Sequence, residues 1–278
     1  MTDLRSEAGG LVRVYPAGDG PLRGAALVWA HGGGFVHGDL DMPEADAVAR
    51  IFAARGATVI SIDYRLVDED GSGCYPAGSD DIVSAWRWAL THGEELGARH
   101  FFLGGASAGA NLVTGAVLRM LGHAPAVETD ALPDGLFLAY PTLLAEQPAA
   151  PAELRALLDA DPDSDRFPSH SVRQMYETYL GGPVGSDAPI SAVPGLATPA
   201  DLAGFPPVIM VNDEADELRV SGELFAAMLA EADVPIDVST EPGTAHGHLN
   251  RPHEPAFIPT VERVTDWFAQ VLSETARA

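Results

Sequence analysis

The feature that most constrains this chain is a regular alternation of short strand-like segments with longer helical segments. Runs rich in β-branched, aromatic and other apolar residues, each bounded by glycine, proline or aspartate, are typical of buried strands. They lie at residues 24–32, 57–65, 100–106, 135–141 and 206–213, with a further strand-like run at 235–242. This alternation predicts an α/β fold with a mostly parallel central sheet and helices on both faces.

Helical patterns fill most of the intervening sequence. Apolar residues recur there at three- and four-residue spacing, and residues typical of helix caps bound several of the segments, such as Gly56 at the end of the first. The predicted helices lie at 44–56, 79–96, 107–121, 220–234 and 260–276.

One segment, residues 143–182, breaks the alternation with proline-punctuated helical pieces. The aromatic and aliphatic spacing of VRQMYETYL, at 172–180, favours at least one packed helix over a disordered loop. We expect this segment to be a cap insertion above the sheet. A chain of 278 residues that is 46% hydrophobic fits one α/β domain with an insertion as well as two separate domains, and we expect a single domain over 1–278.

Charge and composition exclude several function classes. The formal net charge is −24, with sixteen arginines and no lysine, so binding to nucleic acid or to an anionic membrane surface is disfavoured. Neither a signal peptide nor a membrane span is indicated. Cys74 is the only cysteine, which excludes an intramolecular disulfide and a cysteine-cluster metal site. It fits a reducing compartment, and we predict a cytoplasmic protein.

Ser107 lies where a predicted strand changes into a predicted helix, within the pattern Gly105-Ala106-Ser107-Ala108-Gly109. Gly-x-Ser-x-Gly in that setting is typical of a sharp turn that exposes a nucleophilic serine above the carboxyl ends of the strands. The turn requires small neighbours because a larger side chain would strike the adjoining strand or helix. The five-residue pattern also occurs by chance in chains rich in small residues, but its position here favours a nucleophile.

A glycine run, His31-Gly32-Gly33-Gly34, follows the first predicted strand. Consecutive glycines allow backbone amides to turn toward an oxyanion, and we expect Gly33, Gly34 and the amide of Ala108 to form an oxyanion hole. A flexible turn or a phosphate-binding loop are the alternatives, but the sequence lacks the spacing of a phosphate loop.

Other residues of the glycine run and its flank have secondary roles in this interpretation. We expect His31 and Gly32 to shape the loop, because His31 sits at the strand end on the side of the glycines away from the substrate. His37 is a candidate residue of the substrate pocket, and a surface position is the equal alternative.

A serine hydroxyl needs a base and an acid to orient that base. In α/β hydrolases the acid and then the histidine follow the serine along the chain, on loops after later strands. The candidate acids are Asp213, Glu214, Asp216 and Glu217, of which three must be surface or cap residues; the candidate bases are His246, His248 and His253.

The motifs HGGGFVHGDLD, SIDYRL, GASAGANL, FPPVIMVNDEADELR and HGH occur in this order along the chain. In order and approximate spacing the chain resembles the hormone-sensitive-lipase-like carboxylesterases, the HGGG branch of the α/β hydrolases. The resemblance implies the α/β-hydrolase fold and a Ser107, Asp216 and His246 triad, with His248 as a neighbour and candidate pocket residue. It also implies hydrolysis of short-chain, small-molecule carboxylic esters without a metal or organic cofactor, and a possible homodimer.

The chain departs from the family pattern at three places. Ala106 replaces the usual acid beside the nucleophile. At the acid loop Glu217 replaces a proline and Val220 replaces a second acid, which predicts a weaker brace for that loop. The segment 1–22 corresponds to a shortened N-terminal cap, so the acyl pocket is expected to be more open, or closed by the 143–182 insertion or by a partner subunit.

Two further kinds of function fit the same motifs. An amide or formamide hydrolase, or an acyltransferase, would use the same nucleophile. A non-catalytic ligand-binding protein of the same fold is disfavoured because such proteins tend to lose the histidine, whereas all three triad residue types are present here.

Overall fold

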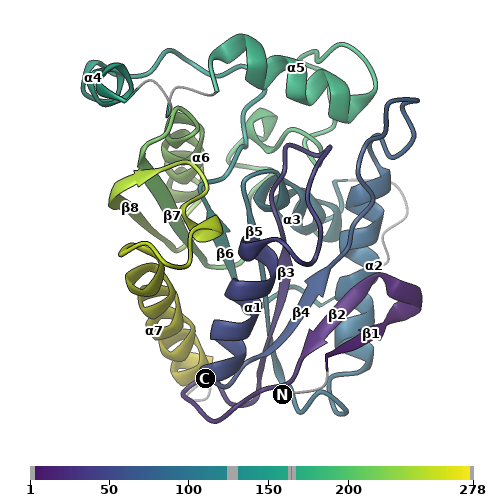
Figure 1. Ribbon diagram of the computed structural model, residues 1–278. Coiled ribbons are helices and arrows are strands. Elements are labelled where there is room, and N and C mark those ends of the chain that lie inside the picture. The colour runs from purple at the N-terminus through teal and green to yellow at the C-terminus, as the bar shows by residue number, and fades with distance from the viewer. Residues whose placement is uncertain (1–3, 124–130, 162–163, 165–166, 276–278) are drawn as a thin grey trace.

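A central sheet organises the computed structural model, which describes residues 4–123, 131–161, 164 and 167–275 (Figure 1). Within these residues the sheet has eight strands in the order β1-β2-β4-β3-β5-β6-β7-β8. From β4 to β8 every neighbouring pair is parallel, and β1 and β2 join antiparallel at one edge. The strands are β1 (Arg5–Glu7), β2 (Val12–Tyr15), β3 (Ala25–Ala30), β4 (Thr58–Ile62), β5 (His100–Ala106), β6 (Gly135–Ala139), β7 (Val208–Ala215) and β8 (Ile236–Ala245). The prediction of an α/β fold with a mostly parallel sheet is confirmed.

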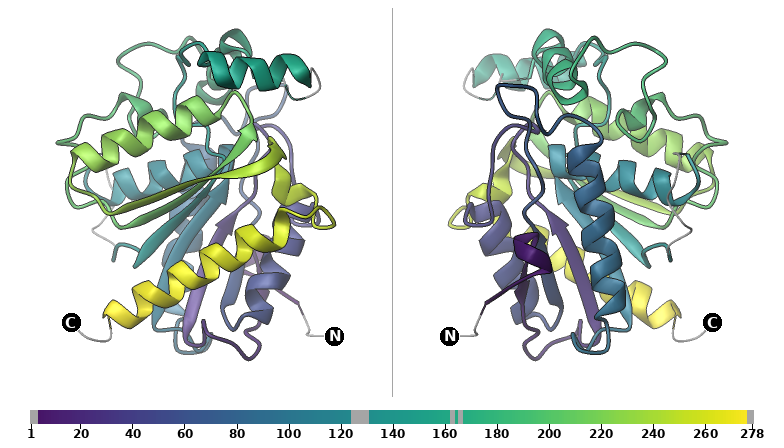
Figure 2. Two further views of the ribbon diagram at one scale, coloured as in Figure 1. Left: turned by 90° about the vertical axis from the view of Figure 1, so that its left-hand side faces the viewer. Right: turned by 90° about the vertical axis from the view of Figure 1, so that its right-hand side faces the viewer.

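Helices cover both faces of the sheet (Figure 2). The helices α1 (Pro43–Ala54) and α7 (Phe257–Thr275) pack on one face, and α2 (Ala77–Thr91), α3 (Ala108–Met120) and α6 (Arg219–Glu231) pack on the other. Because of this double cover, every residue of β3, β4 and β6 is buried, which explains their largely apolar sequences. No described helix is both long and apolar enough to cross a membrane.

Helix boundaries differ from the predictions mainly at the ends. The helix predicted at 79–96 stops at Thr91, and that predicted at 260–276 begins earlier, at Phe257. Pro259 is accommodated in the first turn of α7. A backbone N–H there has no partner within the helix, so its absence in proline costs no hydrogen bond. The last residue of that predicted helix lies outside the described residues.

The N-terminal segment differs from its prediction. Residues 1–22 were expected to be a shortened cap, but their described part contributes β1 and β2 to the sheet edge. Val12 and Val14 of β2 are buried against the core while Arg13 between them is partly exposed, and Val12 pairs with Ile62 of β4. These strands of three and four residues are too short for a periodic signal to identify them.

The segment 143–182 carries the helices α4 (Ala152–Ala160) and α5 (Ser169–Leu180), which lie above the carboxyl ends of the strands (Figure 1). Two tyrosines anchor α5 to the body of the protein. The ring of Tyr179 stacks on Phe35 with centroids 4.1 Å apart. The hydroxyl of Tyr176 accepts a hydrogen bond from Asn111 Nδ2 at 2.8 Å and donates one to the carbonyl of Thr142 at 3.0 Å.

The two tyrosines provide a matched test of how α5 is held. Both side chains are buried, but the Tyr179 hydroxyl has no hydrogen-bond partner among the described residues. We expect Tyr176→Phe to lower the free energy of unfolding by about 1–2 kcal/mol, because it leaves buried polar groups of Asn111 and Thr142 unpaired. Tyr179→Phe should leave it unchanged or raise it slightly. Urea unfolding of both variants checks this, and equal losses would contradict it.

Candidate active site

Ser107 occupies the turn between β5 and α3 and is 6% exposed. Its backbone has φ 51° and ψ −116°, a conformation that a non-glycine residue rarely adopts and that marks a strained functional turn. The flanking glycines are required by close approach: a Cβ on Gly109 would lie 2.3 Å from the carbonyl oxygen of His31, and one on Gly105 would lie 2.5 Å from the backbone of Gly109. The strand-to-helix turn predicted for Ser107 is therefore present.

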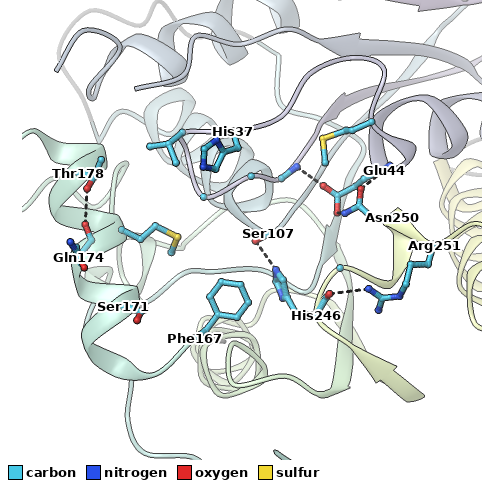
Figure 3. Close-up of a pocket in the computed structure, with 17 residues that line it drawn as sticks. His37, Glu44, Ser107, Phe167, Ser171, Gln174, Thr178, His246, Asn250 and Arg251 are labelled. Atoms are coloured by element: carbon cyan, nitrogen blue, oxygen red, sulfur yellow. Dashed lines mark hydrogen bonds between the residues drawn. The ribbon is translucent and has the colours of Figure 1, made fainter. Parts of the chain in front are cut away.

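His246 lies beside Ser107 in the cavity (Figure 3), and Asp216 lies on the other side of the His246 ring. Asp216 directly follows β7 and is fully buried, and His246 directly follows β8. The His246 Nε2 atom lies 3.0 Å from Ser107 Oγ, and its Nδ1 atom lies 2.7 Å from Asp216 Oδ2. The structure thus brings together the three residues that the sequence resemblance selected, in the relay order serine, histidine, aspartate.

The electrostatic surroundings of His246 favour its protonated form. Burial lowers its pKa, but the charge of Asp216 and the hydrogen bond to it raise the pKa by more, and the charges of Asp213 and Glu44 add to the rise. The net effect places the pKa of His246 above its ordinary value. Such a histidine is suited to take up a proton and to hold the resulting charge.

The glycine loop lies on the other side of Ser107. Gly33 and Gly34 adopt φ values of 122° and 60°, and a Cβ on Gly33 would lie 1.9 Å from the carbonyl oxygen of His37. Both glycines line the cavity, and within the described part of the chain their amides have no acceptor. The amide of Ala108 begins α3, where a first-turn N–H has no partner within the helix. These three amides are available to an anion beside Ser107.

The two upstream histidines differ in position. His31 is fully buried, with its ring stacked on Tyr64 at 4.5 Å and Nδ1 2.7 Å from the carbonyl oxygen of Gly32. It does not line the cavity, and these contacts are those of a residue that shapes the loop. His37 lines the cavity, as proposed for a pocket residue.

His248 is not a pocket residue, contrary to the prediction. It is fully buried, its Nδ1 atom lies 2.5 Å from Asp213 Oδ1, and its Nε2 atom lies 2.9 Å from Thr260 Oγ1. Asp213 also accepts the amide N–H of Gly247 at 2.8 Å. The prediction that Asp213 is a surface or cap residue is therefore wrong, because Asp213 forms a second buried aspartate–histidine pair that braces the turn after His246.

The remaining acid and base candidates lie away from Ser107. Glu214 accepts the amide N–H of Gly243, and His253 is exposed. Glu217 is 7% exposed and its Oε2 atom accepts the amide N–H of Phe167 at 2.8 Å. Gln147 Nε2 donates to the Glu217 carbonyl at 2.8 Å. The acid loop therefore has a brace, which the sequence analysis did not foresee, and it is supplied by the cap segment.

A cavity of about 590 Å³ opens in front of Ser107 and is partly formed by residues that sequence reasoning missed. Phe167 packs against His246 with ring centroids 4.5 Å apart. Met175 lies over the glycine loop, where its sulfur would be 3.5 Å from a Cβ on Gly34. The helical periodicity of residues 172–180 predicts α5, but it does not predict which side chains of α5 face the cavity, because that depends on how the cap packs. The missed lining residues are Val36, Met42, Glu44, Phe167, Ser171, Gln174, Met175, Thr178, Gly247, Asn250 and Arg251.

One group could hold a cation by geometry alone. Ligand atoms of Asp213, Asp216 and His246 lie within 4.8 Å of one another. The same side chains are already joined in hydrogen bonds, Asp216 with His246 and Asp213 with Gly247 and His248. The carboxylates therefore orient the histidines, and the chemistry of the site follows from those pairs.

A serine on a strained strand-to-helix turn, with an aspartate and a histidine from the ends of later parallel strands, defines an α/β hydrolase. Comparison with known proteins agrees, since the sequence profile of the alpha/beta hydrolase fold family matches residues 27–250. Carboxylesterase NlhH of Mycobacterium tuberculosis is 34% identical over 228 residues, which cover 81% of this chain and 66% of NlhH. The chain thus spans just under two thirds of that relative.

Two other proteins give the same result. Ethyl acetate hydrolase of Pseudomonas putida is 30% identical over 249 residues, covering 86% of this chain and 71% of the relative. The crystal structure of brefeldin A esterase, a bacterial homologue of human hormone-sensitive lipase, matches with a TM-score of 0.77 at 26% identity, over 98% of this chain and 76% of that one. The chain belongs to the α/β-hydrolase fold family, and the proteins that it matches include carboxylesterases and a bacterial homologue of hormone-sensitive lipase.

Proposed function

We propose that this protein is a serine esterase that hydrolyses short-chain carboxylic esters of small molecules. The observation that carries the proposal is the continuous hydrogen-bonded relay from Ser107 Oγ through both ring nitrogens of His246 to Asp216. In this arrangement Nδ1 donates to the carboxylate, and Nε2, which then carries no hydrogen, accepts the serine proton.

The reaction proceeds in two acyl transfers. His246 takes the hydroxyl proton as Ser107 Oγ attacks the ester carbonyl carbon, and the tetrahedral intermediate collapses to an acyl-serine. The leaving alcohol carries away the proton from His246. A water molecule then attacks the acyl-serine, again giving its proton to His246, and the acid is released as the Ser107 hydroxyl is restored.

The developing oxyanion is stabilised by the amides of Gly33, Gly34 and Ala108. Gly33 and Gly34 have N–H groups without an acceptor among the described residues, and Ala108 adds the positive end of α3. Donors that are already oriented need no rearrangement when the charge forms, and each is typically worth about 3 kcal/mol of barrier.

The cavity supports a small substrate. Its volume of about 590 Å³ lies in the range of small-molecule sites, and the cap closes it with Met175 over the glycine loop and Phe167 against His246. The name of one relative, ethyl acetate hydrolase, also describes a short ester as substrate. We therefore propose acyl chains of a few carbons for this protein.

A graded series of p-nitrophenyl esters, from acetyl to dodecanoyl, tests this function. Turnover that is highest for acetyl and butyryl esters and falls with longer chains is the expected result. Turnover that peaks at the long chains would overturn the short-chain assignment. If none of the esters were hydrolysed, esterase activity would be rejected, and anilides, formamides and acceptor alcohols would then be assayed for amide hydrolysis and acyl transfer.

The pH dependence of kcat/KM follows from His246. The base must be neutral in the free enzyme, so activity rises as pH passes upward through its pKa. Because the net effect of burial and the neighbouring carboxylates raises that pKa, the acidic limb should lie above the value of about 6.5 for a free histidine. A kcat/KM profile between pH 4 and 9 with a stable buffer series measures it, and a midpoint well below 6 would contradict the expectation.

A further inference from the structure

Glu44 is a buried carboxylate in the wall of the cavity that the relay does not use. It lies in the first turn of α1, is 1% exposed, and lines the cavity beside Ser107 (Figure 3). A Cβ added at Gly32 would be 2.7 Å from Glu44 Oε1 and 3.2 Å from Ser107 Cβ, so the carboxylate and the nucleophile flank the same glycine. A carboxylate is expensive to bury unless its oxygens are hydrogen-bonded.

Both oxygens of Glu44 are engaged, by donors from three different parts of the chain. Oε1 accepts the amide N–H of Gly32 at 2.5 Å. Oε2 accepts the hydroxyl of Tyr140, which follows β6, at 2.5 Å, and the side-chain N–H of Asn250 at 3.0 Å. The backbone N–H of Glu44 returns a hydrogen bond to Asn250 Oδ1 at 3.2 Å.

These donors lie next to the glycine loop and next to His246. Gly32 precedes the two glycines whose amides face the cavity, and Asn250 lies four residues after His246 in the same loop. Tyr140 packs edge-on against the ring of His246 with centroids 5.2 Å apart. One carboxylate therefore ties the glycine loop to the loop that carries the base.

We propose that Glu44 is a positioning residue of this active site, whose carboxylate holds the glycine loop and the histidine loop in fixed relation to Ser107. The proposal rests on the proposed esterase function. It requires a carboxylate because all three partners are donors. An amide at this position would turn its own NH₂ group toward at least one of them.

Two variants separate the position of the carboxylate from its charge. Glu44→Gln removes the charge and mispairs one donor. Glu44→Asp keeps the charge but withdraws it by one methylene from Gly32. We expect both to lower kcat about 10–100-fold, because a small displacement of the oxyanion donors weakens transition-state binding. KM should stay within about threefold of the wild type, since the residue does not hold the ground-state substrate.

The acidic limb of kcat/KM distinguishes the two variants from each other and from a merely structural defect. The charged groups around His246 are Asp216, Asp213 and Glu44, with the Arg251 guanidinium on its backbone carbonyl. Loss of one negative charge lowers the pKa of His246, so the limb should move to lower pH in Glu44→Gln. It should stay in place in Glu44→Asp.

Asp46→Asn is the matched control, because Asp46 lies in the same first turn of α1 but contacts Arg50 and Tyr15 instead of the site. It should leave kcat and the limb unchanged. Asn250→Ala, which removes only the link to the histidine loop, should also lower kcat, and it serves if both Glu44 variants fail to fold in thermal unfolding.

The rate at which a fluorophosphonate labels Ser107 provides a readout that needs no ester substrate. It should fall in the Glu44 variants and not in Asp46→Asn, so this proposal can fail or hold independently of the esterase assignment. Wild-type kcat and labelling rates in folded Glu44 variants, or in Asn250→Ala, would overturn it.

Discussion

Ser107→Ala should lower kcat on a short p-nitrophenyl ester by about 10⁵–10⁶-fold while the protein stays folded. The hydroxyl is the atom that becomes acylated, and no other side chain of the described site can replace it in that step. What remains should be the small rate that the oxyanion amides and substrate binding supply without a nucleophile. The strained backbone at φ 51° accepts alanine as readily as serine, so the turn itself should persist.

The measurement compares wild type and Ser107→Ala side by side on the acetyl ester, with thermal unfolding of each. Fluorophosphonate labelling, followed by intact mass, should add one adduct to the wild type and none to the variant. Turnover retained in a folded, unlabelled variant would contradict the assignment of Ser107 as nucleophile.

Asp216→Asn should lower kcat by about 10⁴-fold, whereas Asp213→Asn should act mainly on stability. With asparagine at 216, the group facing His246 Nδ1 no longer demands a donor, and the ring can adopt the tautomer that places a hydrogen on Nε2. That tautomer cannot accept the proton of Ser107. The change is nearly isosteric, so the effect on folding should be small.

Asp213→Asn is the matched control because both carboxylates are fully buried and both raise the pKa of His246. The electrostatic consequence for His246 is therefore of the same direction in the two variants, and only Asp216 touches Nδ1. At 213 the substitution turns an NH₂ group either toward His248 Nδ1 or toward the backbone N–H of Gly247, which should lower the free energy of unfolding by about 2–4 kcal/mol.

The kinetic and unfolding measurements are made on both proteins at one pH, chosen on the plateau of the wild-type kcat/KM profile. Urea unfolding measures the change in the free energy of unfolding, and steady-state kinetics measures the change in kcat. If a folded Asp213→Asn variant lost more kcat than Asp216→Asn, the catalytic role assigned to the Asp216–His246 pair would be contradicted.

The cap gives the site much of its shape through the acid loop. Glu217, next to Asp216, accepts the backbone N–H of Phe167, and Phe167 packs on the ring of His246. Replacement of the family's proline by glutamate thus exchanges a stiff turn for a contact with the cap. The cap segment and His246 are thereby joined through the side chains of Glu217 and Phe167.

Local sequence was sufficient for the elements whose signal is contained in a few neighbouring residues. The strand-to-helix turn at Ser107 and the glycine loop at 32–34 are specified by small residues that alone fit the close backbone approaches there. The buried strands β3 to β7 were predicted because double cover by helices makes their sequences largely apolar. The family resemblance then selected Asp216 and His246 by position in a motif.

Tertiary structure alone decided which side chains meet across the sheet. Asp213 and Asp216 are three residues apart on one strand end, and His246 and His248 are two apart on the next, so either aspartate could in principle face either histidine. The β-bulge between Asp213 and Ala215, where β7 and β8 shift register, and the turn after Ala245 determine the pairing that forms. Glu44, Phe167 and Asn250 join the site in the same way, from segments that lie far apart in the sequence. Contacts over such separations depend on how the helices and the cap pack on the sheet, and a pattern of neighbouring residues does not predict that packing.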